Sequence, residues 1–125
     1  MKKAFWWGIG TIALFIIIIY FVATSSGSGK YDGLAQCISD SGAKMYGAYW
    51  CPHCQEQKKL FGSSWDSVTY VECASSKSNQ QTSDCNAAGI KSYPTWIFGD
   101  GKQISGVLSL EQLSTFTSCD LPIEE

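Results

Sequence analysis

The chain opens with a long apolar stretch, passes through a short polar one, and then alternates between apolar and polar runs. Residues 5–23 contain no charged side chain, and as a helix they would span about 28 Å, close to the thickness of the hydrocarbon core of a bilayer. This pattern predicts a cytoplasmic N-terminus and a transmembrane anchor over residues 1–23. A flexible linker rich in glycine and serine follows at residues 24–30.

The charges that flank the apolar stretch predict its orientation. Lys2 and Lys3 precede it and only Lys30 follows closely, so the positive-inside rule places the rest of the chain outside the cytoplasm, in a periplasm or a lumen. A cleaved signal peptide is the alternative, although the apolar stretch is longer than is usual for one. Both alternatives place the remainder of the chain outside the cytoplasm.

The remainder reads as one α/β domain, residues 31–119, with a short tail at residues 120–125. The expected elements are a helix from Tyr31 to about Ser41, a strand over 43–50, a helix over 52–61, a strand over 67–73, a short helix near 85–88, strands over 95–98 and 103–107, and a last helix after Ser109. Ser109 and Gln112 form a capping box for that helix, and an Asp-Gly turn joins the last two strands. The order predicts a four-stranded mixed sheet flanked by helices.

Charge and cysteine content narrow the class of protein. Residues 31–125 hold six lysines, no arginine and eleven acidic residues, a net charge of −5. No basic patch indicates nucleic-acid binding. Six cysteines in so short a domain are typical of an oxidising compartment, in agreement with the orientation of the apolar stretch.

The most informative motif is Trp50-Cys51-Pro52-His53-Cys54, which joins the apolar strand to a helix-prone stretch. Cys51 would then lie at a helix N-terminus, where free N–H groups and the helix dipole stabilise a thiolate. His53 could add positive potential there, or could be an exposed residue with no role. The motif predicts a reversible dithiol/disulfide.

Two other interpretations of Cys51 and Cys54 are weaker. A zinc site needs two more ligands, and Cys73 and Cys85 are too far apart in sequence for a zinc knuckle. A purely structural disulfide would not need Pro-His between the cysteines. We therefore expect neither a metal nor a bound cofactor, only a redox-active disulfide.

The other four cysteines allow three pairings. Cys73 and Cys85 flank a polar loop, while Cys37 and Cys119 lie near the two ends of the domain. We favour Cys73–Cys85 and Cys37–Cys119 as structural bonds that hold the scaffold. In the alternative, Cys73 and Cys85 form a second relay pair.

Taken together, the predicted elements, the WCPHC motif and a Tyr-Pro-Thr sequence resemble a thioredoxin-fold protein over residues 31–119. The chain is most similar to the thioredoxin-like domain that is fused to, or partnered with, bacterial vitamin K epoxide reductase homologues. The stretches that carry this match are YGAYWCPHCQ (46–55), QKKLFG (57–62), YVEC (70–73) and GIKSYPTW (89–96). As a set they are far more specific than two cysteines three residues apart.

The resemblance implies roles for the residues of the site. Cys51 would be the exposed nucleophile and Cys54 the buried resolving thiol, with Pro52 and His53 tuning the pair. Pro94 would be cis and lie beside the disulfide. One residue departs from the family pattern, since many thioredoxins carry a buried acid where this chain has Met45.

A substrate-binding surface follows from the same resemblance. The backbone beside Pro94, at Tyr93 and Thr95, could pair with a bound peptide. Trp50 and Tyr93, and less favourably Trp96, could form an apolar rim, or could be ordinary core and edge aromatics.

These observations favour a membrane-anchored oxidoreductase that passes its disulfide to cysteine-containing exported proteins. The resemblance implies reoxidation by a quinone-linked membrane partner of the vitamin K epoxide reductase type. In the alternative, an anchored reductase or isomerase receives electrons from a membrane transporter. A tethered binding module without catalysis is a third hypothesis, which the intact cysteine motif disfavours.

Overall fold

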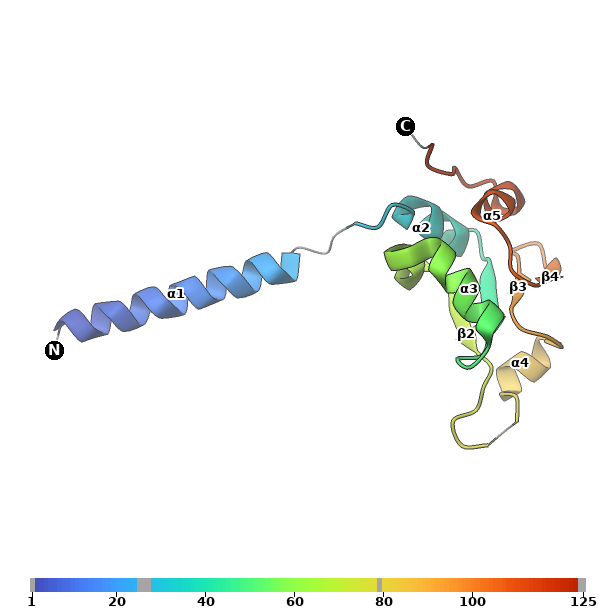
Figure 1. Cartoon of the computed structure of the whole chain (residues 1–125), viewed down its shortest axis with the longest axis horizontal. Coiled ribbons are helices and arrows are strands. Elements are labelled where there is room, and N and C mark those ends of the chain that lie inside the picture. The colour runs from blue at the N-terminus through green and yellow to red at the C-terminus, as the bar shows by residue number, and fades with distance from the viewer. Residues whose placement is uncertain (1, 25–27, 79, 124–125) are drawn as a thin grey trace.

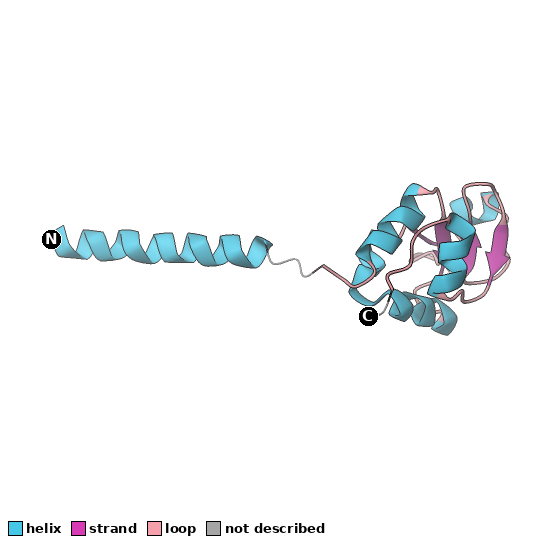
Figure 2. Ribbon diagram, turned by 90° about the horizontal axis from the view of Figure 1, so that it is seen from above, coloured by secondary structure: helices cyan, strands magenta, loops and turns pink. Residues whose placement is uncertain are grey.

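The computed structural model describes residues 2–24, 28–78 and 80–123. Helix α1 (Lys2–Thr24) lies apart from the other elements in both views (Figures 1 and 2), and its side chains at positions 10–22 are exposed. Among the residues whose side chains are described, no helix is both long enough and apolar enough to cross a membrane. Residues 25–27 of the predicted linker and 124–125 of the predicted tail lie outside the described residues.

The rest of the described chain forms a four-stranded mixed sheet with helices. The elements are α2 (Asp32–Asp40), β1 (Lys44–Gly47), α3 (Pro52–Phe61), the 3₁₀ helix η1 (Gly62–Ser67), β2 (Tyr70–Glu72), α4 (Ser83–Ala87), β3 (Thr95–Ile97), β4 (Gln103–Ser105) and α5 (Leu110–Thr117). The strand order is β2-β1-β3-β4, with β1 parallel to β2 and β3 antiparallel to both β1 and β4. The predicted sheet is confirmed, and the arrangement is consistent with a thioredoxin-like fold.

The strands are shorter than predicted, since β2 covers Tyr70–Glu72 instead of 67–73 and β4 covers Gln103–Ser105 instead of 103–107. Strand β1 ends at Gly47 instead of Trp50, because the Ala48 carbonyl accepts the N–H of Cys51 and turns the chain into α3. Gly62 ends α3, as its position after Phe61 predicts, and its φ of +57° lies in the left-handed region that suits glycine. The 3₁₀ helix η1, which the sequence pattern did not predict, follows directly from this residue.

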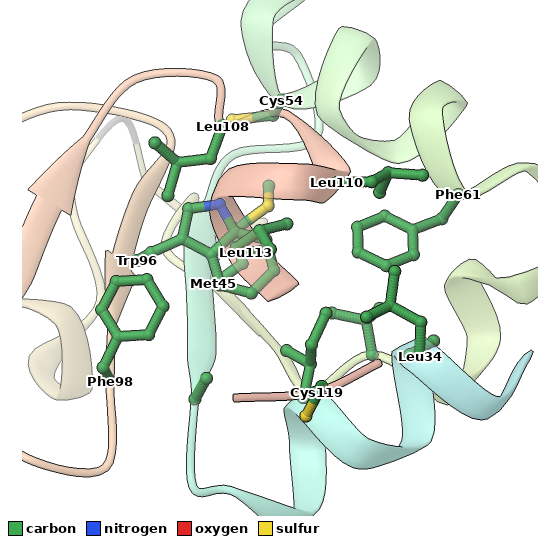
Figure 3. Close-up of a cluster of buried hydrophobic side chains, with 14 of the residues drawn as sticks. Leu34, Met45, Cys54, Phe61, Trp96, Phe98, Leu108, Leu110, Leu113 and Cys119 are labelled. Carbon is green, nitrogen blue, oxygen red and sulfur yellow. The ribbon is translucent and has the colours of Figure 1, made fainter. Parts of the chain in front are cut away.

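The core lies between the sheet and helices α2, α3 and α5 (Figure 3). Trp96 on β3 is fully buried and stacks on Phe98, with ring centroids 6.4 Å apart. Met45 on β1 and Leu113 on α5 are also fully buried in this cluster. The apolar sheet face and the apolar face of α5 therefore form one core, as the sequence pattern predicts.

A polar residue, Gln57, lies within this core. Its Nε2 donates to the Leu108 carbonyl at 2.9 Å, and its Oε1 accepts the Leu108 N–H at 2.7 Å and the Trp96 Nε1–H at 3.2 Å. Buried polar groups need such partners because they have lost those that water provided. Gln57 thus fastens α3 to β3 and to the segment that precedes α5.

Both favoured disulfides are present in the structure. Cys37 of α2 is bonded to Cys119, just after α5, across a sequence separation of 82. Cys73, which follows β2, is bonded to Cys85 of α4 across a separation of 12. The capping box is present too, since Ser109 Oγ accepts the Gln112 N–H and Gln112 Oε1 accepts the Ser109 N–H.

Candidate redox site

Cys51 occupies the N-cap of α3, where the chain turns from β1 into the helix. Pro52 lies in the first turn of α3, and the Cys51 Sγ accepts the N–H of Cys54 at 3.3 Å. Proline suits the start of a helix because its missing N–H would have no partner within the helix. The Cys51 sulfur thus receives a backbone donor at the positive end of the helix dipole, an arrangement that stabilises a thiolate.

The two thiols differ in their access to solvent. Cys51 is 5% exposed and Cys54 is fully buried, and neither is bonded to another cysteine in the structure. The expectation that Cys51 is an exposed nucleophile is therefore wrong as stated. The contacts that Cys51 makes with the segment before Pro94 leave only a small part of the residue accessible, and Cys54 lies behind it.

Burial governs the chemistry of the inner thiol. Removal from water, followed by a hydrogen bond with the Cys51 side chain, raises the pKa of Cys54 to about 12, while the charge of Lys58 acts in the opposite direction. Burial has this effect because it penalises the charged thiolate. Cys54 therefore keeps its proton at neutral pH, and the resolving role that the sequence resemblance implies for it requires removal of that proton.

The segment that contains Pro94 lies against Cys51. The Tyr93–Pro94 peptide bond is cis, as the resemblance implies. The Cys51 thiol contacts the Tyr93 carbonyl at 3.8 Å. Trp50 packs edge-on against the Tyr93 ring, with ring centroids 6.0 Å apart. Trp50 is 61% exposed, so this aromatic pair reaches the surface beside Cys51, and its role as a rim that admits peptide stays a prediction.

The residues after Pro94 belong to the interior. Thr95 is 2% exposed, and its hydroxyl pairs with the Ser92 carbonyl at 2.8 Å and with the Ser105 hydroxyl at 2.9 Å. Its side chain is therefore part of the core and does not face an incoming substrate. Trp96 is fully buried, so the interpretation of that residue as part of the rim is wrong.

His53 lies on the outer surface of α3. Its imidazole Nδ1 is 3.5 Å from the Glu56 carboxylate, and both side chains are largely exposed. A charge on His53 would therefore be partly balanced by Glu56 and screened by water. His53 is two residues from Cys51 in sequence, but its ring is exposed to solvent.

An apolar group stands where many thioredoxins have a buried acid. Met45 is fully buried on β1. A Cβ added to Gly47 would lie 2.8 Å from the Cys54 Sγ and 3.3 Å from the Met45 Cε. A methyl group thus lies beneath the inner thiol, in agreement with burial as the main cause of its raised pKa.

The sequence interpretation missed the role of Glu72, at the end of β2. Its Oε1 accepts the N–H groups of Tyr49 at 3.2 Å and Ala74 at 2.9 Å, and its Oε2 accepts the Tyr70 hydroxyl at 2.8 Å. Glu72 therefore holds the segment that leads into Cys51. An acidic residue at the end of an otherwise apolar strand was the signal that could have revealed it.

The described residues contain no group of three or more His, Cys, Asp or Glu side chains that could hold a metal ion. Cys73 and Cys85, the candidates for completing a zinc site, are bonded to each other. A relay through that pair is not tested by the structure. What the geometry provides at Cys51 and Cys54 is a dithiol whose outer cysteine is nearly buried and whose inner cysteine is fully buried.

Comparison with known proteins points to the same chemistry. No family model matches the chain. A curated protein of Arabidopsis thaliana, LTO1, is 41% identical over 102 residues, which make up 78% of this chain. That relative is a thiol-disulfide oxidoreductase. The similarity supports an oxidoreductase activity, although the matched region is only 27% of the relative's length.

Proposed function

We propose that the chain is an enzyme of thiol–disulfide exchange that passes a Cys51–Cys54 disulfide to exported proteins. The observation that carries the proposal is the placement of Cys51 at the N-terminus of α3, with the fully buried Cys54 one turn later. A pair that served only to hold the scaffold would not need one sulfur at a helix N-terminus with a backbone N–H donor and the other fully buried. The named activity of the relative supports the same conclusion.

The exchange starts from the oxidised pair. A substrate thiolate attacks the Cys51 sulfur, the bond to Cys54 breaks, and the departing Cys54 sulfur takes up a proton. A second substrate thiolate then attacks the substrate sulfur of the mixed disulfide, and Cys51 leaves as a thiolate. Two electrons have moved from the substrate to the pair, which is now reduced.

The local structure favours this direction. The helix N-terminus stabilises the departing Cys51 thiolate, and a stabilised leaving thiolate departs faster. Because the same contacts stabilise the reduced form, they make the pair more oxidising. The raised pKa of Cys54 keeps that sulfur protonated once it has left, which limits its return attack on the mixed disulfide.

Membrane attachment and the electron acceptor are further parts of the proposal. The uncharged residues 5–23 support an anchor, and the orientation of the flanking lysines supports a periplasmic or luminal domain. The sequence resemblance supports reoxidation by a quinone-linked partner of the vitamin K epoxide reductase type. The short linker would keep Cys51 near such a partner and raise its effective concentration there.

The decisive experiment traps the mixed disulfide with Cys54→Ala in the full-length chain. We expect Cys51 to stay covalently bound to exported proteins and to a quinone-linked membrane protein, and Cys51→Ser to trap none of them. Capture of an electron-donating transporter, with a mostly reduced pair in cells, would reverse the direction of electron flow. A reduction potential near that of thioredoxin, about −270 mV, would also contradict an oxidase, and full function in Cys51→Ser would leave only a binding module.

A further inference from the structure

A cavity of about 280 Å³ opens beside the redox site. Part of its lining is aromatic, formed by Tyr49, Trp50 and Tyr93, and another part belongs to the polar hairpin between the bridged residues Ala74 and Gln81. Trp50 immediately precedes Cys51, and the Tyr93 carbonyl contacts its thiol. The cavity therefore shares Trp50 and Tyr93 with the surroundings of Cys51, and a polypeptide whose cysteine reaches Cys51 comes close to it.

The lining of the cavity favours an uncharged group that has both an apolar and a polar part. The hairpin presents Ser75, Ser78 and Gln80, and none of the described residues that line the cavity is charged. The two serine hydroxyls accept backbone N–H groups from within the hairpin, which leaves their own O–H groups able to donate. The cavity thus offers apolar contact on one side and hydrogen-bond donors on the other.

The hairpin is held in place before any substrate arrives. Its base is closed by the Cys73–Cys85 disulfide. Gln81 accepts the Tyr93 hydroxyl and donates to the Ile90 carbonyl at 3.1 Å. The polar wall is thereby tied to the aromatic one, and a preformed cavity avoids part of the cost of ordering on binding.

We propose that this cavity binds the side chain of a tyrosine or tryptophan that lies within two residues of the reactive cysteine in the substrate polypeptide. Such side chains have an apolar body and a polar tip. The body packs against Trp50 and Tyr93, and the tip reaches the serine hydroxyls of the hairpin. The inference rests on the proposed exchange activity and assigns a sequence preference to it.

The test measures the rate at which the oxidised full-length protein reacts with short cysteine peptides that differ only beside the cysteine. The neighbouring residue is Tyr, Phe, Ala, Lys or Glu, and glutathione serves as a small thiol that cannot fill the cavity. We expect the Tyr peptide to react roughly tenfold faster than the Ala peptide, since burial of an aromatic ring is worth at least that factor. The Phe peptide should fall between them, and the charged peptides should gain nothing.

Two variants locate the preference. Ser78→Trp fills the cavity, whereas Ser76→Trp adds the same bulk at an exposed position of the same hairpin that does not line it. We expect Ser78→Trp to abolish the preference for tyrosine and Ser76→Trp to keep it, with the glutathione rate of Ser76→Trp equal to that of the wild type.

The possible failures are distinguishable. Equal rates across the peptide series, or a preference that survives in Ser78→Trp, would overturn the cavity assignment while normal exchange with glutathione upholds the proposed function. If the wild-type pair exchanges with neither glutathione nor any peptide, the exchange activity is wrong and the cavity assignment fails with it.

Discussion

Replacement of Gln57 by methionine should destabilise the domain strongly, although the new side chain is similar in length and more apolar. The change leaves three buried groups without their partner, namely the Trp96 Nε1–H, the Leu108 N–H and the Leu108 carbonyl. A buried group that loses its hydrogen-bond partner costs about 1–3 kcal/mol. Even at the low end of that range, the expected loss in the free energy of unfolding is about 3 kcal/mol.

The measurement is guanidinium-induced unfolding of the full-length protein, followed by tryptophan fluorescence with the two structural disulfides intact. Gln36→Met on α2 is the matched control, because Gln36 is exposed and its Nε2 pairs only with the Asp40 carboxylate, at 2.9 Å, among the contacts described. An exposed change of this kind should alter stability by no more than about 0.5 kcal/mol. A loss of less than about 1 kcal/mol in Gln57→Met, or a loss equal to that of the control, would refute the argument. Water or local rearrangement would then satisfy the three groups.

Two further predictions concern the inner thiol. Gly47→Ala places a Cβ 2.8 Å from the Cys54 Sγ and 3.1 Å from the Tyr70 ring, so we expect thermal unfolding to show a loss of about 1–3 kcal/mol in the free energy of unfolding. Gly33→Ala, with open space around its Cβ, is the control and should not destabilise the domain. Equal losses in the two variants would contradict the packing argument. The pKa values of Cys54 and Tyr70 are both raised in the folded protein, so the unfolded chain loses these two protons at lower pH than the folded one. The reduced protein therefore keeps their contribution to stability below about pH 9 and loses it as the pH rises toward about 12. Cys54→Ala should show a shallower decline over that window, and identical pH profiles would show that the inner thiol does not titrate as described.

The sequence pattern predicted the elements that depend on local signals. Helix α3 has the predicted bounds, because Pro52 marks its start and the buried Phe61 is its last residue. The capping box of α5 was likewise visible in two residues. The order of elements also sufficed to predict a parallel pair of strands followed by an antiparallel hairpin.

What the sequence did not reveal depends on contacts between distant segments. The sequence analysis gave Gln57 no structural role, yet it is spaced three residues from Cys54 and four from Phe61, the other buried positions of α3. That spacing was a usable signal of an inward-facing polar side chain. The shielding of Cys51 and the cavity beside it had no such signal, because both arise where the segment at Tyr93 and the hairpin after β2 meet the start of α3.

The bond between Cys37 and Cys119 can form only late in the synthesis of the chain. A growing chain produces Cys37 first and must add 82 further residues before its partner exists. For most of that interval the unpaired Cys37 shares the nascent chain with Cys51 and Cys54, the thiols of the proposed exchange site. A premature bond between them can be undone only by the same reaction that the finished protein is proposed to perform, so each new copy would be a natural client of the copies made before it.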